Sequence, residues 1–182
     1  MWLKYLTVII LFYIFDILQN SFFVHFNLFG TVPNLVFVLF FSLVFFSTKS
    51  GQAPGWENVF YALLAGLILD ISSYTYLGVS MILLLVIALF VKKTQTLLQE
   101  KKNDKFPFAY FLSLFFISIV AYELLFMIFL DKFNTARLLA GLNRGFIIEI
   151  IYNLIIASAI FYIYKKYFKS GHDDRQLKLF SK

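Results

Sequence analysis

The chain of 182 residues contains no cysteine and only two histidines, His25 and His172, which lie far apart in the sequence. The lack of thiols excludes a disulfide framework, thiolate metal ligands and a cysteine nucleophile. Two distant imidazoles are too few for a histidine-based metal centre or a catalytic triad. We therefore expect neither a metal site nor a cofactor in this protein.

Charged residues are scarce as well. They make up 14% of the chain, whereas hydrophobic residues make up 61% and the mean hydropathy is +0.82. Soluble domains contain about 45–50% apolar and about 25% charged residues. A water-soluble fold of this length could not bury so much apolar surface, so the sequence predicts a membrane protein. The net charge of +6 then indicates orientation and contact with anionic lipids, and no nucleic acid partner is expected.

Six apolar segments approach the length of about 20 residues that a helix needs to cross a bilayer. Pro33 suits the first turn of the second segment, where its missing N–H is no loss. The sequence thus predicts an all-α, polytopic membrane protein, a six-transmembrane-helix bundle over residues 1–170 with a short basic cytoplasmic tail over residues 171–182. We expect helices at residues 3–26, 33–47, 56–70, 77–92, 107–130 and 145–164.

The basic residues predict the orientation of these helices, because cytoplasmic loops of membrane proteins are rich in Lys and Arg. With both termini in the cytoplasm, only Lys132, Arg137 and Arg144 fall outside. We expect residues 92–105 to form a solvated cytoplasmic hairpin near anionic lipid, and residues 131–144 to form a short interfacial helix. The remaining basic residues all fall inside: Lys4, Lys49, Lys92, Lys93, Lys101, Lys102, Lys105, Lys165, Lys166, Lys169, Arg175, Lys178 and Lys182.

Two polar stripes interrupt the apolar segments. Asp16, Gln19 and Asn20 share one helix face, and Glu149 and Asn153 share another. Polar side chains in hydrocarbon are costly and tend to face the interior of a bundle, so the two stripes can meet and hydrogen-bond. Such a contact is either glue between helices or the lining of a ligand cavity or docking site.

Two further carboxylates, Glu123 and Glu57, lie within or beside the apolar segments. Glu123 falls in the middle of the fifth segment and has no evident partner in the sequence. Glu57 is expected at the membrane interface. For Glu149 a salt bridge with Arg144 is an alternative to the polar stripe.

The segment 60–91 carries the strongest local pattern, because two apolar runs are joined by a short polar turn and predict a helical hairpin. Small residues lead along one face to Asp70, with Gly66 one turn before it, and small faces let helices approach closely. Asp70 is expected to cap the turn by accepting hydrogen bonds from the amides of Ser72 or Ser73. The alternative is that Asp70 contacts a partner across the outer leaflet. Gly78 then permits a tight return into the next helix.

These features together resemble the MreD family, the integral membrane subunit of the bacterial rod-shape machinery. The resemblance extends over most of the chain through the length and the six spans. The residues that carry it are Pro33, Asn34, Gly66, Asp70, Leu77 and Gly78.

The resemblance implies a scaffold and not an enzyme. It implies a fold like that of the substrate-binding (S) component of energy-coupling-factor transporters, and a place in the bacterial cytoplasmic (inner) membrane. The implied partners are MreC, a single-span protein with a coiled coil, the filament protein MreB, the glycosyltransferase RodA and its transpeptidase. The implied function is to couple the filaments to peptidoglycan synthesis and so to maintain rod shape.

An alternative function is that of the S subunit of an energy-coupling-factor vitamin transporter, which has six helices and a similar length. Those proteins often carry an Ala-x-x-x-Ala motif in the first helix, whereas the first alanine of this chain is Ala53. An intramembrane enzyme would need a convergent catalytic set. No Ser/His, His/Glu or paired-Asp arrangement meets that requirement, so no catalytic residue is predicted.

Overall fold

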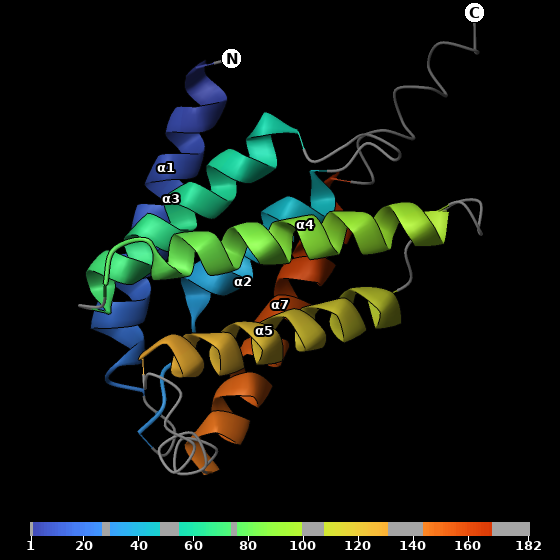
Figure 1. Ribbon diagram of the computed structural model, residues 1–182. Helices are drawn as coiled ribbons and strands as arrows, with labels where there is room; N and C mark the ends of the chain where they lie inside the picture. Colours follow the sequence, from blue (N-terminus) through green and yellow to red (C-terminus); the bar gives the residue numbers. More distant parts are fainter. Residues whose placement is uncertain are drawn as a thin grey trace, which may run out of the picture.

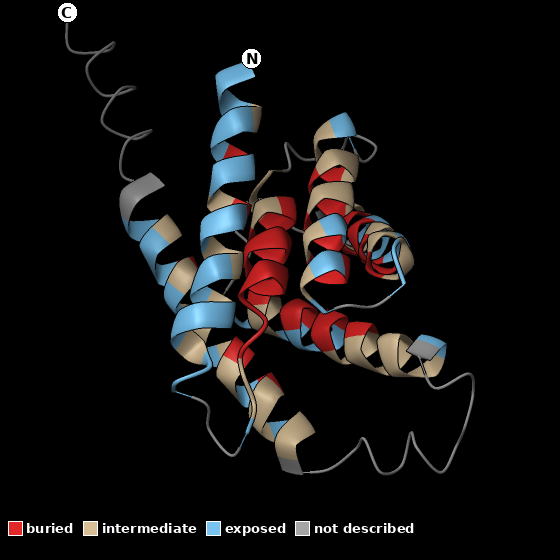
Figure 2. Cartoon of the chain, turned by 90° about the vertical axis from the view of Figure 1, so that its left-hand side faces the viewer, coloured by how far each residue is buried: buried red, intermediate tan, exposed pale blue. Residues whose placement is uncertain are grey.

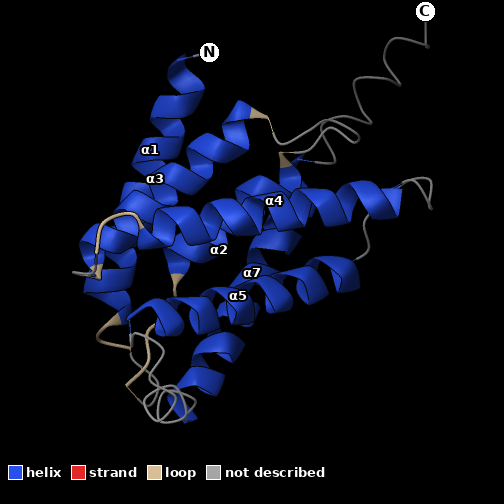
Figure 3. Ribbon diagram, viewed as in Figure 1, coloured by secondary structure: helices blue, strands red, loops and turns tan. Residues whose placement is uncertain are grey.

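The computed structural model describes residues 2–26, 30–47, 55–73, 76–99, 108–130 and 144–168, and the regular elements in these ranges are all helices (Figures 1 and 3). The predicted all-α class is confirmed. The first helix continues directly into a π-helical segment, η1. The elements are α1 (Trp2–Ile17), η1 (Leu18–Phe23), α2 (Leu35–Phe46), α3 (Trp56–Ser72), α4 (Val79–Gln99), α5 (Phe108–Leu130) and α7 (Arg144–Phe168).

Four helical stretches in this part of the chain are long and apolar enough to cross a membrane: Trp2–Phe23, Val79–Leu97, Phe108–Phe129 and Gly145–Lys166. They confirm the predicted polytopic membrane class. The 12 residues of α2 give about 18 Å of helix, less than the hydrocarbon thickness of about 30 Å. The count of six full spans therefore stays a prediction.

The helix boundaries agree with the sequence at some ends and differ at others. The beginning of α3 at Trp56 and the end of α5 at Leu130 were both predicted. The end of the fourth helix was predicted too early, because α4 continues in regular helix to Gln99, well past Lys92. The tail 171–182 and most of the outer segment 131–144 lie outside the described residues, so their predicted structures stay predictions.

The short helix α2 lies at the centre of the molecule. It packs against α1, η1, α3, α4, α5 and α7, and ten of its twelve residues are buried. A helix that is apolar on all sides is expected to be buried in a protein core, and α2 is buried in this way. Figure 2 shows the buried central helix beside α1, which is exposed along most of its length.

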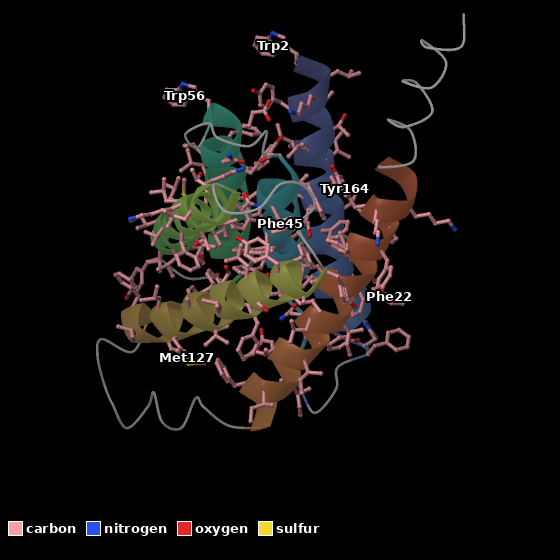
Figure 4. All side chains as sticks on the ribbon, turned by 90° about the vertical axis from the view of Figure 1, so that its right-hand side faces the viewer. Trp2, Phe22, Phe45, Trp56, Met127 and Tyr164 are labelled. Atoms are coloured by element: carbon pink, nitrogen blue, oxygen red, sulfur yellow. The ribbon has the colours of Figure 1, made fainter. Side chains whose placement is uncertain are left out.

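The helix ends gather at two levels. At one level the beginning of α1 meets the beginning of α3 through an ion pair between Lys4 and Glu57, 2.8 Å long. The end of α2 joins them there, because the hydroxyl of Ser47 donates to Asn58 near the beginning of α3 at 2.6 Å. The end of α7 lies at this level too, since Phe46 of α2 stacks on Tyr164 with centroids 3.7 Å apart. Figure 4 shows Trp2 projecting at this end of the molecule, beside the beginning of α3. The first and last described helices thus have their outer termini at the same level.

Candidate functional site

The predicted hairpin is present as α3 and α4, which form the most extensive helix pair of the described structure. The two helices approach closely at Gly66, which has no room for a side chain. A Cβ atom placed there would lie 2.5 Å from the backbone nitrogen of Met81, 2.9 Å from its Cγ, and against its Cα as well. The predicted small face on α3 therefore packs directly on the backbone of α4.

Asp70 holds the turn of this hairpin, although through other amides than those predicted. Its Oδ2 accepts a hydrogen bond from the Gly78 amide at 2.6 Å, and its Oδ1 accepts one from the Ser80 amide at 2.9 Å. The prediction of Ser72 or Ser73 as the donor was wrong, because the Ser73 amide donates to the carbonyl of Leu69 within the last turn of α3.

The two amides that donate to Asp70 lie at the beginning of α4. The free N–H groups of this first turn need hydrogen-bond acceptors from another part of the chain. Gly78 precedes the first helical residue and has no side chain to cap the helix, and its φ of +103° is one that other residues rarely adopt. Asp70 supplies the missing acceptors from α3, and its negative charge lies at the positive end of the α4 dipole. Asp70 is only 1% exposed.

A third helix joins the turn through two residues that the sequence analysis did not single out as functional. The hydroxyl of Ser80 lies 3.2 Å from the hydroxyl of Tyr122 on α5. The Tyr122 ring also packs against Phe37 of α2, with centroids 5.1 Å apart. The sequence around Tyr122 is apolar and gave no sign that this residue bonds to the turn. The position of Ser80, two residues after the turn glycine Gly78, was a weak sign of such a bond.

The polar stripe at the end of the first helix forms hydrogen bonds at the end of the bundle where the turn between α3 and α4 lies. Asp16 accepts hydrogen bonds from Ser72 at 2.6 Å and from Asn20 at 2.9 Å. The amide oxygen of Gln19 accepts from the backbone nitrogen of Val36, 3.4 Å away at the beginning of α2. The stripe thus ties α1 and η1 to α3 and α2 as interhelical glue.

The opening of α2 also uses a polar side chain. Asn34 is the N-cap, and its Oδ1 accepts a hydrogen bond from the Phe37 amide at 3.0 Å. Pro33 lies one residue before this cap, so its predicted place in the first turn of the helix was wrong by two positions. Asn is favoured at the N-cap because its short amide side chain can accept a hydrogen bond from a free N–H of the first turn. Leu77 lies in the turn before α4 and is exposed.

The second predicted stripe lies on α7 and faces α5. Among the described residues, Glu149 and Asn153 make no hydrogen bond with Asp16, Gln19 or Asn20, so the predicted hydrogen bonding between the two stripes is not present. Glu149 instead interacts electrostatically with Glu123 of α5. The side chain of Arg144, the other predicted partner of Glu149, lies outside the described residues.

A polar network at the opposite end escaped prediction. Lys92 was expected in a solvated loop, but it lies within α4, is 4% exposed, and donates to the Ser47 hydroxyl at 3.5 Å. That hydroxyl also donates to Asn58 at 2.6 Å, and Gln95 donates to the carbonyl of Phe45 at 3.2 Å. The cation and the amide of α4 therefore lie at the carboxyl end of α2, where positive charge is favourable.

Apolar helices around a buried central helix, with interior polar side chains bonded to helix ends, define a polytopic integral membrane protein. The model of the family described as rod shape-determining protein MreD matches residues 2–171 of the chain. The chain therefore belongs to the MreD family, as the sequence pattern indicated. No curated protein and no solved structure matched the chain in the comparisons.

Proposed function

We propose that this protein is a membrane scaffold subunit of the bacterial elongation machinery, which binds MreC and helps to couple MreB filaments to peptidoglycan synthesis. Its family supports a role in determining rod shape, and that family is not known for catalysis. In this proposal the protein makes and breaks no bond. It holds partner helices in fixed positions, so that filaments inside the cell direct wall synthesis outside.

The use of interior polar groups is the structural observation that supports a scaffold. Asp70 and Asn34 bond to the free amides at the beginnings of α4 and α2, and Gln95 bonds to a carbonyl at the end of α2. These side chains stabilise helix ends against one another. We infer that helix ends fixed in this way keep the outer surface of the bundle constant, which suits the positioning of partners.

The proposed location is the bacterial cytoplasmic membrane with both termini in the cytoplasm. The strong excess of basic residues on one side supports this orientation. The structure is compatible with it, since the outer ends of α1 and α7 share one level. A fluorescent protein fused to the C-terminus should fluoresce in cells, whereas activity of a periplasmic phosphatase fused there would contradict the orientation.

Complementation of a depletion strain tests the scaffold function and the candidate site together. We expect the unaltered protein to restore rod shape and to co-purify with MreC, and RodA with its transpeptidase to be retained in milder extraction. Gly66→Leu and Asp70→Ala should still insert into the membrane but lose both properties. Gly55→Ala is the control, because no atom lies within 4 Å of a Cβ at that position.

Two outcomes would count against different parts of the proposal. If both altered proteins restored rod shape at normal protein levels, the assignment of the hairpin turn as the functional site would be wrong. Rescue without any association of the unaltered protein with MreC would leave the family role intact but contradict the adaptor mechanism.

A further inference from the structure

Two carboxyl groups lie at the same level of the helix pair α5 and α7. These helices run antiparallel, since Phe111 near the beginning of α5 packs on Phe161 towards the end of α7. Glu123 and Glu149 lie at the other end of the pair and interact electrostatically. Neither carboxyl group has a hydrogen bond or an ion pair with another described residue. A cation that carries hydrogen-bond donors would satisfy both carboxyl groups from a position between them.

Asn153 provides an independent sign of a ligand at the same place. It follows Glu149 by one turn, so both side chains lie on the face of α7 that meets α5. Asn153 is 0% exposed, and neither its Oδ1 nor its Nδ2 has a hydrogen-bond partner among the described residues. Buried side-chain amides in proteins are nearly always hydrogen-bonded, so an unpartnered Asn153 one turn from Glu149 points to a polar ligand at this place.

We propose that Glu123, Glu149 and Asn153 form a binding site for a primary ammonium group. The ammonium is carried either by a free small amine or by the headgroup of an ethanolamine lipid. This inference does not depend on the proposed scaffold function.

The chemistry of the three side chains selects this ligand. A primary ammonium has three N–H donors and no acceptor, and the two carboxyl groups and the Asn153 Oδ1 offer three acceptors. Calcium takes six to eight oxygen ligands and magnesium an octahedral set, which two carboxylates and one amide do not supply. The ammonium therefore fits this small set of acceptors better than a divalent metal ion does.

The depth of the site suits a lipid headgroup or a small amine that enters from the membrane surface. Glu149 is five residues after the beginning of α7 at Arg144, and Glu123 is seven residues before the end of α5 at Leu130. At 1.5 Å per residue the pair lies roughly 10 Å below the helix ends. A headgroup ammonium can reach this depth without entering the middle of the hydrocarbon.

The test uses the full chain in nanodiscs and measures its thermal stability. Two pairs of probes differ only in N–H donors: phosphatidylethanolamine against phosphatidylcholine discs, and methylammonium against tetramethylammonium chloride. We expect phosphatidylethanolamine, methylammonium or both to raise the melting temperature, while the quaternary analogues do not. Stabilisation by methylammonium in phosphatidylcholine discs identifies a free amine as sufficient, and stabilisation by phosphatidylethanolamine alone identifies the lipid.

Variants assign the effect to the site. The double variant Glu123→Gln/Glu149→Gln keeps the side-chain shapes and should weaken the apparent affinity for the ammonium probe by about tenfold or more. Glu57→Gln, which removes one negative charge at the other end of the molecule, should leave the affinity unchanged. Equal stabilisation of the unaltered protein by primary and quaternary probes would overturn the proposal, as would full retention of the effect in the double variant.

Discussion

The helices α1 and α2 are both strongly apolar, yet they lie in opposite environments. Ten of the twelve residues of α2 are buried, whereas only Val8 and Phe12 are buried among the sixteen of α1. Both buried residues of α1 lie four positions apart, so this helix touches its neighbours along one narrow stripe. The rest of its apolar surface faces outwards (Figure 2).

This difference shows that apolar character alone does not decide which helix is central in a membrane protein. Lipid tails are as apolar as leucine, so hydrophobic side chains gain little by leaving the lipid for the protein interior. Polar side chains that bond to the backbone groups at the two ends of α2 distinguish it from α1, whose Lys4 and Asp16 bond through their side chains. Asn34 and Gln19 accept from its first amides, and Gln95 donates to the carbonyl of Phe45 near its end.

The largest effect is expected where the inner helices approach most closely. On helix propensity alone, Gly66→Ala would stabilise α3 by about 1 kcal/mol. We expect instead a loss of about 3 kcal/mol or more, because the added Cβ overlaps the Met81 backbone. The free energy of unfolding in bicelles measures this, with Gly55→Ala as the control in open space. A stabilised Gly66→Ala variant would contradict the close packing of α3 on α4.

The next effect tests the polar bonds of the inner helices. Asp70→Ala leaves two amides of the first turn of α4 without acceptors, and we expect a loss of about 3 kcal/mol. Asp70→Asn retains one acceptor oxygen and should lose less. The free energy of unfolding in bicelles again measures the loss in each variant. Equal stability of Asp70→Ala and the unaltered protein would show that the hydrogen bonds to Gly78 and Ser80 do not stabilise the turn.

A matched pair of leucines compares α1 and α2 directly. Leu39 of α2 is buried and Leu6 of α1 is exposed. Leu39→Ala should cost about 2 kcal/mol, because it leaves a cavity that neighbouring helices cannot fill. Leu6→Ala should cost less than about 0.5 kcal/mol, since lipid fills the space. Equal losses of unfolding free energy in the two variants would mean that α1 is packed as tightly as α2, which would contradict the difference between the two helices.

The smallest effect is expected at the ion pair that joins α1 to α3. Lys4 and Glu57 are both exposed, so solvent and headgroups compete with their 2.8 Å contact. Glu57→Gln should change the free energy of unfolding by about 0.5 kcal/mol or less. A loss as large as that of Asp70→Ala would mean that the outer edge depends on charge as much as the interior does.

Sequence alone predicted the class, several boundaries and the small face of the hairpin. Those features follow from local signals, such as apolar length, Trp56 at a helix beginning and Gly66 one turn before Asp70. The burial of Lys92, the contact of Ser80 with Tyr122 and the electrostatic interaction of Glu123 with Glu149 were not predicted. They depend on which helices become neighbours, and uniformly apolar helix faces do not specify their partners.

Native mass spectrometry of the chain, gently extracted from its own membranes, tests the central claim most directly. We predict co-purification with MreC, recognised as a single-span protein with a coiled coil. A stoichiometric adduct of vitamin size without MreC would contradict the scaffold function and favour that of a transporter subunit.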